Sequence, residues 1–337
     1  MKKRVAFILT CTLLVGLAFA ATSIGVISIP AEAVLPIIQA KLTGSAVPPQ
    51  WEIYSMTLWQ LRLPRVILSI LAGGALALGG AAFQTIFRNP ICDPYILGIS
   101  SGASLGAGIA IIIGIDIYLF GTTLGALLMA LLTLFFILTL AKTGKQKTIE
   151  TLLLAGVALN FLLSALLTMM MVLHQEAMEE IIFWTMGSFA TAGWIENLIL
   201  FVMLSIVTFV LLFYSKDLNI MQLGDDISKT SGVNTERVTY IVLIFSSILV
   251  AIVVAFCGVI GFVGLVIPHL VRILFGNKNQ SVFVFSLIFG AFFCLLADLI
   301  ARTVAAPAEL PVGSITALIG APYFLYLLIV KRYKSII

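Results

Sequence analysis

Charged residues are scarce in this chain of 337 residues. Asp, Glu, Lys and Arg together make up 10% of the sequence, whereas hydrophobic residues make up 61%. Soluble domains carry about 25% charged residues. No soluble fold could bury so much apolar surface, which excludes a soluble protein of two domains and predicts that lipid acts as the solvent.

Possible metal ligands are also few. No two cysteines lie at metal-binding or redox spacing, and neither histidine lies near a cysteine. These residues are Cys11, Cys92, Cys257 and Cys294, with His174 and His269. Cysteines in or beside apolar runs are most often inert apolar side chains. We therefore expect no bound metal and no cofactor held by this chain.

A phosphate-binding loop is missing as well. The nearest approach to the pattern G-x-x-x-x-G-K-[ST] is Gly144-Lys145, and Gln146 stands where Ser or Thr is needed. The chain is therefore not expected to be an enzyme or to hydrolyse ATP itself.

Long apolar segments are abundant instead. A membrane-spanning helix needs about 20 mostly apolar residues. We expect an all-α integral membrane protein with one transmembrane domain over residues 1–337. The ten predicted spans are residues 5–25, 64–85, 95–114, 118–140, 150–173, 195–215, 238–258, 262–275, 281–301 and 312–330. Segment 181–192 is apolar but too short to cross, which indicates a re-entrant or interfacial helix.

The N-terminal segment imitates a secretory signal, with a basic start at residues 1–4 and small residues at positions 18 and 20. We favour an uncleaved first span because the apolar run continues beyond residue 20, with cleavage as the alternative. Ten spans then place both termini in the cytoplasm. On that topology 15 of the 19 Lys and Arg residues lie on the cytoplasmic side, as the positive-inside rule requires.

The basic residues on the outer side are Lys41, Arg62, Arg65 and Arg302. They could be snorkelling side chains at the membrane interface. The functional alternative is a docking site for an acidic partner outside the membrane.

Glycines recur every three to four positions in the second and third predicted spans. They are Gly73, Gly74, Gly79, Gly80, Gly98, Gly102, Gly106 and Gly108. Such spacing lets helix backbones approach closely. Spans two to five and seven to ten each begin with an Arg-led helix followed by a Gly-rich hairpin, which predicts two inverted-repeat halves.

Few polar side chains interrupt these spans. Asp298 and Arg302 are four residues apart on one helical face, which predicts a structural ion pair. The polar loop 216–236 could be a solvated loop or a short helix that docks into a soluble partner. Met169, Met170, Met171 and His174 could be apolar lining or a permeation surface.

Five sequence segments resemble the FecCD/BtuC-like permeases of type II ABC importers. They are LRLPRVILSILAGGALALGGAAFQTIFRNPICDPYILGISSGASLGA (61–107), FWTMGS (183–188), LGDDISKTSGVN (223–234), GVIGFVGLVIPHLVR (258–272) and ADLIARTVAAPAELPVGSITALIGAP (297–322). The resemblance implies a homodimer with ten helices per subunit in a bacterial or archaeal cytoplasmic (inner) membrane. It also implies two ATP-binding subunits, which use ATP and Mg, and a periplasmic or lipid-anchored substrate-binding protein.

The same resemblance implies roles for individual residues. The docking residues for the binding protein would be Arg62, Arg65 and Arg302. The residues coupled to the ATPase would be Leu223, Gly224, Asp225, Asp226, Ser228, Gly232, Val233 and Asn234, in the cytoplasmic coupling loop 216–236. Asn89 and the fifth span, with its Met169–Met171 cluster and His174, would lie near the gate and pathway.

The sequence does not identify the transported substrate. Family members carry ferric siderophores, haem, cobalamin or molybdate and tungstate, and no motif separates them. We rank a ferric siderophore or haem first. The rival class is an ion-coupled secondary transporter, which needs buried carboxylates in mid-span, and Asp298 already has Arg302 beside it.

Overall fold

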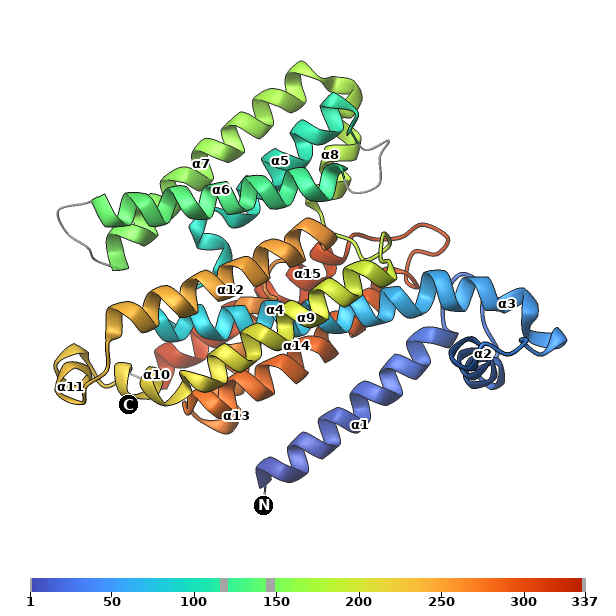
Figure 1. Cartoon of the computed structure of the whole chain (residues 1–337), viewed down its shortest axis with the longest axis horizontal. Coiled ribbons are helices and arrows are strands. Elements are labelled where there is room, and N and C mark those ends of the chain that lie inside the picture. Colours follow the sequence, from blue (N-terminus) through green and yellow to red (C-terminus); the bar gives the residue numbers. More distant parts are fainter. Residues whose placement is uncertain (1, 116–120, 144–148, 335–337) are drawn as a thin grey trace.

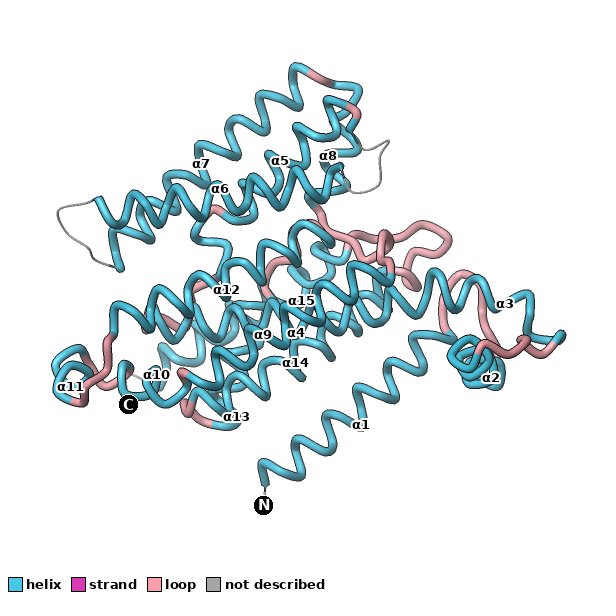
Figure 2. The backbone as a smooth tube through the Cα atoms, in the orientation of Figure 1, coloured by secondary structure: helices cyan, strands magenta, loops and turns pink. Residues whose placement is uncertain are grey.

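The computed structural model describes residues 2–115, 121–143 and 149–334, and within these ranges all regular structure is helical. The expected all-α fold is confirmed (Figures 1 and 2). The described helices that correspond to the predicted spans are α1 (Lys2–Ser23), α4 (Leu63–Ile86), α5 (Ile99–Ile113), α6 (Gly121–Thr143), α7 (Ile149–Leu173), α9 (Trp194–Phe213), α12 (Thr235–Cys257), α13 (Val263–Phe275), α14 (Asn279–Ala301) and α15 (Val312–Lys334). The Lys145-Gln146 pair and the start of predicted span 118–140 lie outside the described residues.

Membrane-crossing capacity follows from length and composition. Seven of the described helices are long and apolar enough to span a bilayer, and three shorter apolar helices cover Ile99–Ile113, Val263–Phe275 and Val312–Tyr326. These helices lie where hydropathy predicts spans. The apolar segment 181–192 contains the end of α8 (Met178–Thr185), which is too short to cross.

The second predicted span is longer than expected at its N-terminal side. Helical structure runs without a break from Pro49, through α3 (Glu52–Met56) and the π-helical segment η2 (Thr57–Arg62), into α4. The predicted span begins only at residue 64, and no predicted span or short helix covers α2 (Ala31–Thr43). Polar residues hide both segments from a hydropathy reading. The apolar face of α2 buries Val34 and Ile37 against Leu58 of η2.

The helices form two groups. Helices α5, α6, α7 and α8 lie together on one side of α12, and α4, α9, α13 and α14 lie on its other side (Figure 1). Among the described elements, α4 and α14 pack against one another most extensively. Helix α4 is the most deeply buried candidate span, so it forms the centre of the second group.

Glycines make the close helix crossings possible. An added Cβ at Gly73 would overlap the backbone oxygen of Gly290, so α4 and α14 touch backbone to backbone. Gly80 meets Gly264 of α13 in the same way, as Gly106 of α5 meets α6. The packing role predicted for the glycine-rich spans is therefore present in the structure.

The two ends of the molecule carry different short elements. Helices α10 (Ser215–Met221) and α11 (Asp225–Thr230) lie near the C-terminal end, whereas α2 and α3 lie at the opposite end (Figure 1). Loops gather mainly at these two ends (Figure 2). The remaining short turns are η1 (Pro49–Trp51), η3 (Pro94–Leu97), which opens α5, and η5 (Gln175–Ala177), which precedes α8.

Candidate functional site

A buried ionic network occupies the end of the molecule that carries α2 and α3. Arg65, at the start of α4, donates from Nε to Asp298 Oδ1 at 2.9 Å. Its Nη1 donates to both carboxylate oxygens of Glu309, at 3.0 and 2.8 Å. Arg302 Nε lies 3.5 Å from Asp298 Oδ2. The predicted Asp298–Arg302 pair is present, and Arg65 and Glu309 are members of the network that the sequence reasoning did not include.

Backbone carbonyls at the end of α1 complete this network. Arg62 Nη1 donates to the carbonyl oxygens of Thr22 and Ser23 at 2.9 and 2.8 Å, and its Nη2 donates to that of Ile27. Arg302 Nη2 donates to the carbonyl oxygen of Ala21 at 2.6 Å. The last carbonyls of a helix lack intrahelical partners and carry the negative end of the helix dipole. They therefore attract these two guanidinium groups.

The three arginines that were predicted to dock the binding protein are buried. Arg62, Arg65 and Arg302 are only 7%, 9% and 4% exposed. They hold α1, α4 and α14 together rather than standing free on the surface. A partner could reach them only by replacing a group that already binds them.

A cavity of about 660 Å³ with both polar and apolar lining residues lies between α5 and α7. Its polar lining comes from Ser100, Ser101 and Ser104 of α5, Asn160 and Ser164 of α7, and Asp93, Tyr95 and Thr185. Ile91, Ile96, Val157, Phe161, Leu167 and Val259 supply the apolar part. Among these described lining residues there is no Lys, Arg or His. The cavity therefore offers hydroxyl and amide groups without a fixed positive charge.

Asn160 builds one wall of this cavity. Its Nδ2 donates to the carbonyl oxygens of Tyr95 and Ile96 at 3.2 and 3.3 Å, and its Oδ1 accepts from Ser101 Oγ at 2.6 Å. Gly156, one turn earlier, allows α7 to approach the backbone of Ile96 closely. One amide of α7 thus fixes the short turn η3 and the start of α5.

Asp93 lies in the connection that precedes η3. Burial raises the pKa of its carboxyl group to about 6, against the opposing effect of the hydrogen bond from the Tyr95 backbone amide. That bond measures 2.8 Å and caps η3. The carboxyl group is thus the titratable acid in the cavity lining.

The residues expected at the gate and pathway do not line this cavity. Asn89 is exposed and accepts from the backbone amide of Ile91 at 3.0 Å, so it stabilises its own turn. Met171 packs near the Ile111–Ile181 cluster, and His174 Nδ1 lies 3.5 Å from Glu176. The Met169–Met171 cluster is at the far end of α7. Their gate role stays a prediction.

The serines and Asn160 were missed as site residues. The available signal was the serine-rich start of the third predicted span and a lone Asn within the otherwise apolar fifth span.

The expected coupling segment is a short helix. Leu223 is 65% exposed and Ile227 is 48% exposed, so apolar side chains face outward from α11. Ser228 is fully buried and donates to the carbonyl oxygen of Gly224 at 2.7 Å. Gly232 follows the helix with a φ of +77°, and Val233 packs against the core.

The remaining coupling residues frame α11. Asn234 Oδ1 accepts from the backbone amide of Arg237 at 3.0 Å and caps α12. Asp226 is exposed, and the side chain of Asp225 lies outside the described part of the structure.

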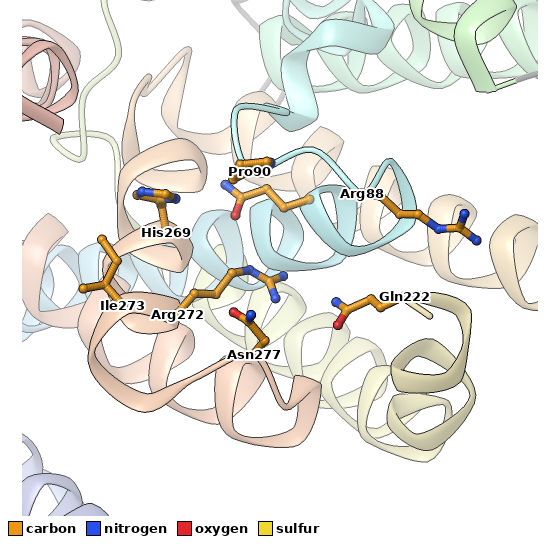
Figure 3. Close-up of a pocket in the computed structure, with 8 residues that line it drawn as sticks. Arg88, Pro90, Gln222, His269, Arg272, Ile273 and Asn277 are labelled. Carbon is orange, nitrogen blue, oxygen red and sulfur yellow. The ribbon is translucent and has the colours of Figure 1, made fainter. Parts of the chain in front are cut away.

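A second cavity, of about 390 Å³, lies next to α10 at the same end of the molecule (Figure 3). It is lined by Gln84, Arg88, Pro90, Gln222, His269, Arg272, Ile273 and Asn277. Arg272 donates to Thr85 Oγ1 at 2.8 Å and to the carbonyl oxygen of Ala81 at 3.3 Å. It thereby fixes α13 to the end of α4.

Comparison with known proteins identifies a family and several similar permeases. The model of the FecCD transport family matches residues 12–330. The molybdate import system permease protein MolB of Haemophilus influenzae is 36% identical over 93% of this chain and 91% of its own length. The hemin transport system permease protein HmuU of Yersinia pestis is 39% identical over 81% of this chain and 83% of its own length. A solved metal-chelate type ABC transporter in an inward-facing conformation superposes with a TM-score of 0.82 at 35% identity, over 95% of this chain and 97% of that chain.

Proposed function

Because the chain belongs to the FecCD transport family and is a membrane-spanning permease subunit of an ABC importer, we propose that it imports a metal chelate. A ferric siderophore or haem is the first choice of cargo. The alternatives within this architecture are cobalamin and molybdate or tungstate.

The cavity between α5 and α7 carries this proposal. Its hydroxyl and amide groups can exchange hydrogen bonds with the oxygens of a chelate, and Phe161 and Leu167 offer apolar contact to its organic part. A bulky cargo is then held weakly by many neutral groups. Weak binding suits a pathway, because a cargo that binds tightly there is released slowly.

Molybdate is the second candidate because the Haemophilus influenzae relative covers nearly the whole chain. Serine hydroxyls can donate to a tetrahedral oxyanion. The described residues of the cavity lining include no Lys, Arg or His that could bind its charge, so the metal chelate stays first.

The assembly that we propose contains two copies of this chain, two ATP-binding subunits and an external substrate-binding protein in a bacterial or archaeal inner membrane. Both termini face the cytoplasm. The polar residues Asn160 and Ser164 of the poorly buried helix α7 support a second copy that encloses a pathway, because polar side chains disfavour lipid. The exposed apolar residues Leu223 and Ile227 support contact of α11 with the ATP-binding subunit.

Transport then follows from motion at that contact. ATP and Mg act in the partner subunits, whose closure moves α11 and the attached helices. The two copies rock and open the pathway alternately to each side. The cargo crosses without any covalent change.

The test is uptake into liposomes that contain the complete complex. We expect ATP-dependent uptake of radiolabelled ferric siderophore or haem that requires the binding protein, and none of molybdate or cobalamin. Uptake of molybdate alone would favour the second candidate. Gradient-driven uptake by the permease without its ATP-binding subunits would replace the proposal with the ion-coupled secondary transporter.

A further inference from the structure

Glu309 covers the network of buried arginines from outside. It lies between α14 and α15, and both of its carboxylate oxygens accept from Nη1 of Arg65. The Glu309 side chain is 42% exposed, whereas that of Arg65 is 10% exposed. The exposed carboxylate therefore occupies the outward-facing hydrogen-bonding atom of an otherwise buried guanidinium group.

The two carboxylates on Arg65 differ in how easily they can leave. Asp298 is fully buried, so its departure would strand a charge in an apolar interior. Glu309 is exposed to solvent, and exposed ion pairs contribute little to stability. Glu309 can thus rotate into water at small cost while Asp298 keeps Arg65 in place.

The net charge of the arginine network favours binding of an anionic group. Arg62, Arg65 and Arg302 carry three positive charges against the two negative charges of Asp298 and Glu309, a formal balance of +1. When Glu309 turns away, the local balance rises to +2. Arg62 and Arg302 are engaged with backbone carbonyls at the end of α1. Arg65 is therefore the arginine of the three whose outer ligand is exchangeable.

We propose that Glu309 is a displaceable internal ligand that holds the place of a carboxylate on the substrate-binding protein. On docking, the partner's Asp or Glu takes over Arg65 Nη1 as Glu309 leaves, so one carboxylate replaces another on the same donor. Until then Glu309 keeps Arg65 from binding other anions. This inference rests on the proposed function, since it requires an external binding protein.

The experiment measures binding to the full-length permease complex in lipid nanodiscs. The probe is the purified secreted binding protein encoded beside the permease gene, without its signal or lipid anchor. Glu309→Gln should lower the Kd about fivefold, as expected when an exposed competing ion pair is lost. The matched control is Glu52→Gln, which removes an exposed charge of α3 at the same end of the molecule. It should change the Kd less than twofold at 0.15 M salt, because distant charges are screened.

A double-mutant cycle tests the route through Arg65. Arg65→Gln should weaken binding, and Glu309→Gln should have no further effect in that background. If Arg65→Gln does not fold, Arg65→Lys replaces it in the same cycle. Lys keeps the positive charge but lacks the several fixed N–H donors of the guanidinium group. An unchanged or raised Kd for Glu309→Gln, with normal binding by the wild type, overturns the inference alone. Absence of binding by the wild type overturns the docking proposal itself, and the inference with it.

Discussion

Replacing Asp298 with Asn tests whether the ionic network holds together the ends of α1, α4 and α14 that meet at it. The Asp298 side chain is fully buried and is shared by Arg65 at 2.9 Å and Arg302 at 3.5 Å. Asn has almost the same volume and keeps one acceptor oxygen, so packing changes little. The substitution therefore removes mainly the negative charge between two buried guanidinium groups.

The expected cost can be estimated from the partners that remain. Removing one member of a buried ion pair typically costs 3–5 kcal/mol. Arg65 keeps Glu309, and Arg302 keeps the carbonyl oxygen of Ala21. The cost should thus lie at the low end, at about 3 kcal/mol. For domains of 150–250 residues each kcal/mol shifts the Tm by about 2–4 °C, so a decrease of about 6–12 °C is expected.

The assay is a heating series of detergent-solubilised protein, followed by size-exclusion chromatography of the material that remains folded. Glu309→Gln is the control, because it removes the exposed carboxylate from the same Arg65 and should lower the Tm by less than about 3 °C. Equal decreases for the two variants, or a decrease below 2 °C for Asp298→Asn, would refute the reasoning.

Three further changes probe other parts of the molecule. Gly73→Leu should prevent the close crossing with Gly290 and abolish recovery of folded protein on size-exclusion chromatography, whereas Gly16→Leu, which meets no atom within 4 Å, should be recovered normally. Ile227→Lys should leave the permease folded but reduce co-purification of the ATP-binding subunit at least tenfold, as expected for an apolar contact residue. The free energy of unfolding should decrease as pH rises from about 4 to about 6 because of Asp93. Burial raises the pKa of its carboxyl group from 3.8 to about 6 in the folded state, so ionisation over this range favours the unfolded state. Asp93→Asn should remove that loss in thermal unfolding measured across this pH range, and an unchanged pH profile would contradict it.

The sequence was sufficient for the helical framework because lipid imposes a simple rule. Every spanning backbone must satisfy its own hydrogen bonds, so apolar segments of sufficient length become helices. Glycine spacing also carried information, since the positions at 73 and 80 are where α4 crosses α14 and α13.

Features that depend on tertiary contact could not be read in the same way. Helix α2 and the extension of α4 back to Pro49 contain polar residues, and their stability comes from packing around Leu58. The arginines near residue 62 looked like surface cations, because the sequence does not tell which carbonyls or carboxylates meet them. Glu309 is 244 residues from Arg65 along the chain, so no local spacing could pair them.

Helix α4 connects the two ends of the molecule through contacts with α14. At one end Arg65 binds Asp298, and at the other end Thr85 Oγ1 donates to Asn279 Oδ1 at 2.9 Å. Between these bonds the backbones touch at Gly73, which leaves little freedom for the two helices to slide. The Asn279 backbone amide in turn donates to Asn219 Oδ1 of α10 at 2.9 Å, and α10 leads into α11. A displacement of α11 therefore acts on a pair of helices fastened at both ends, and α14 of this pair carries Asp298, which binds Arg65.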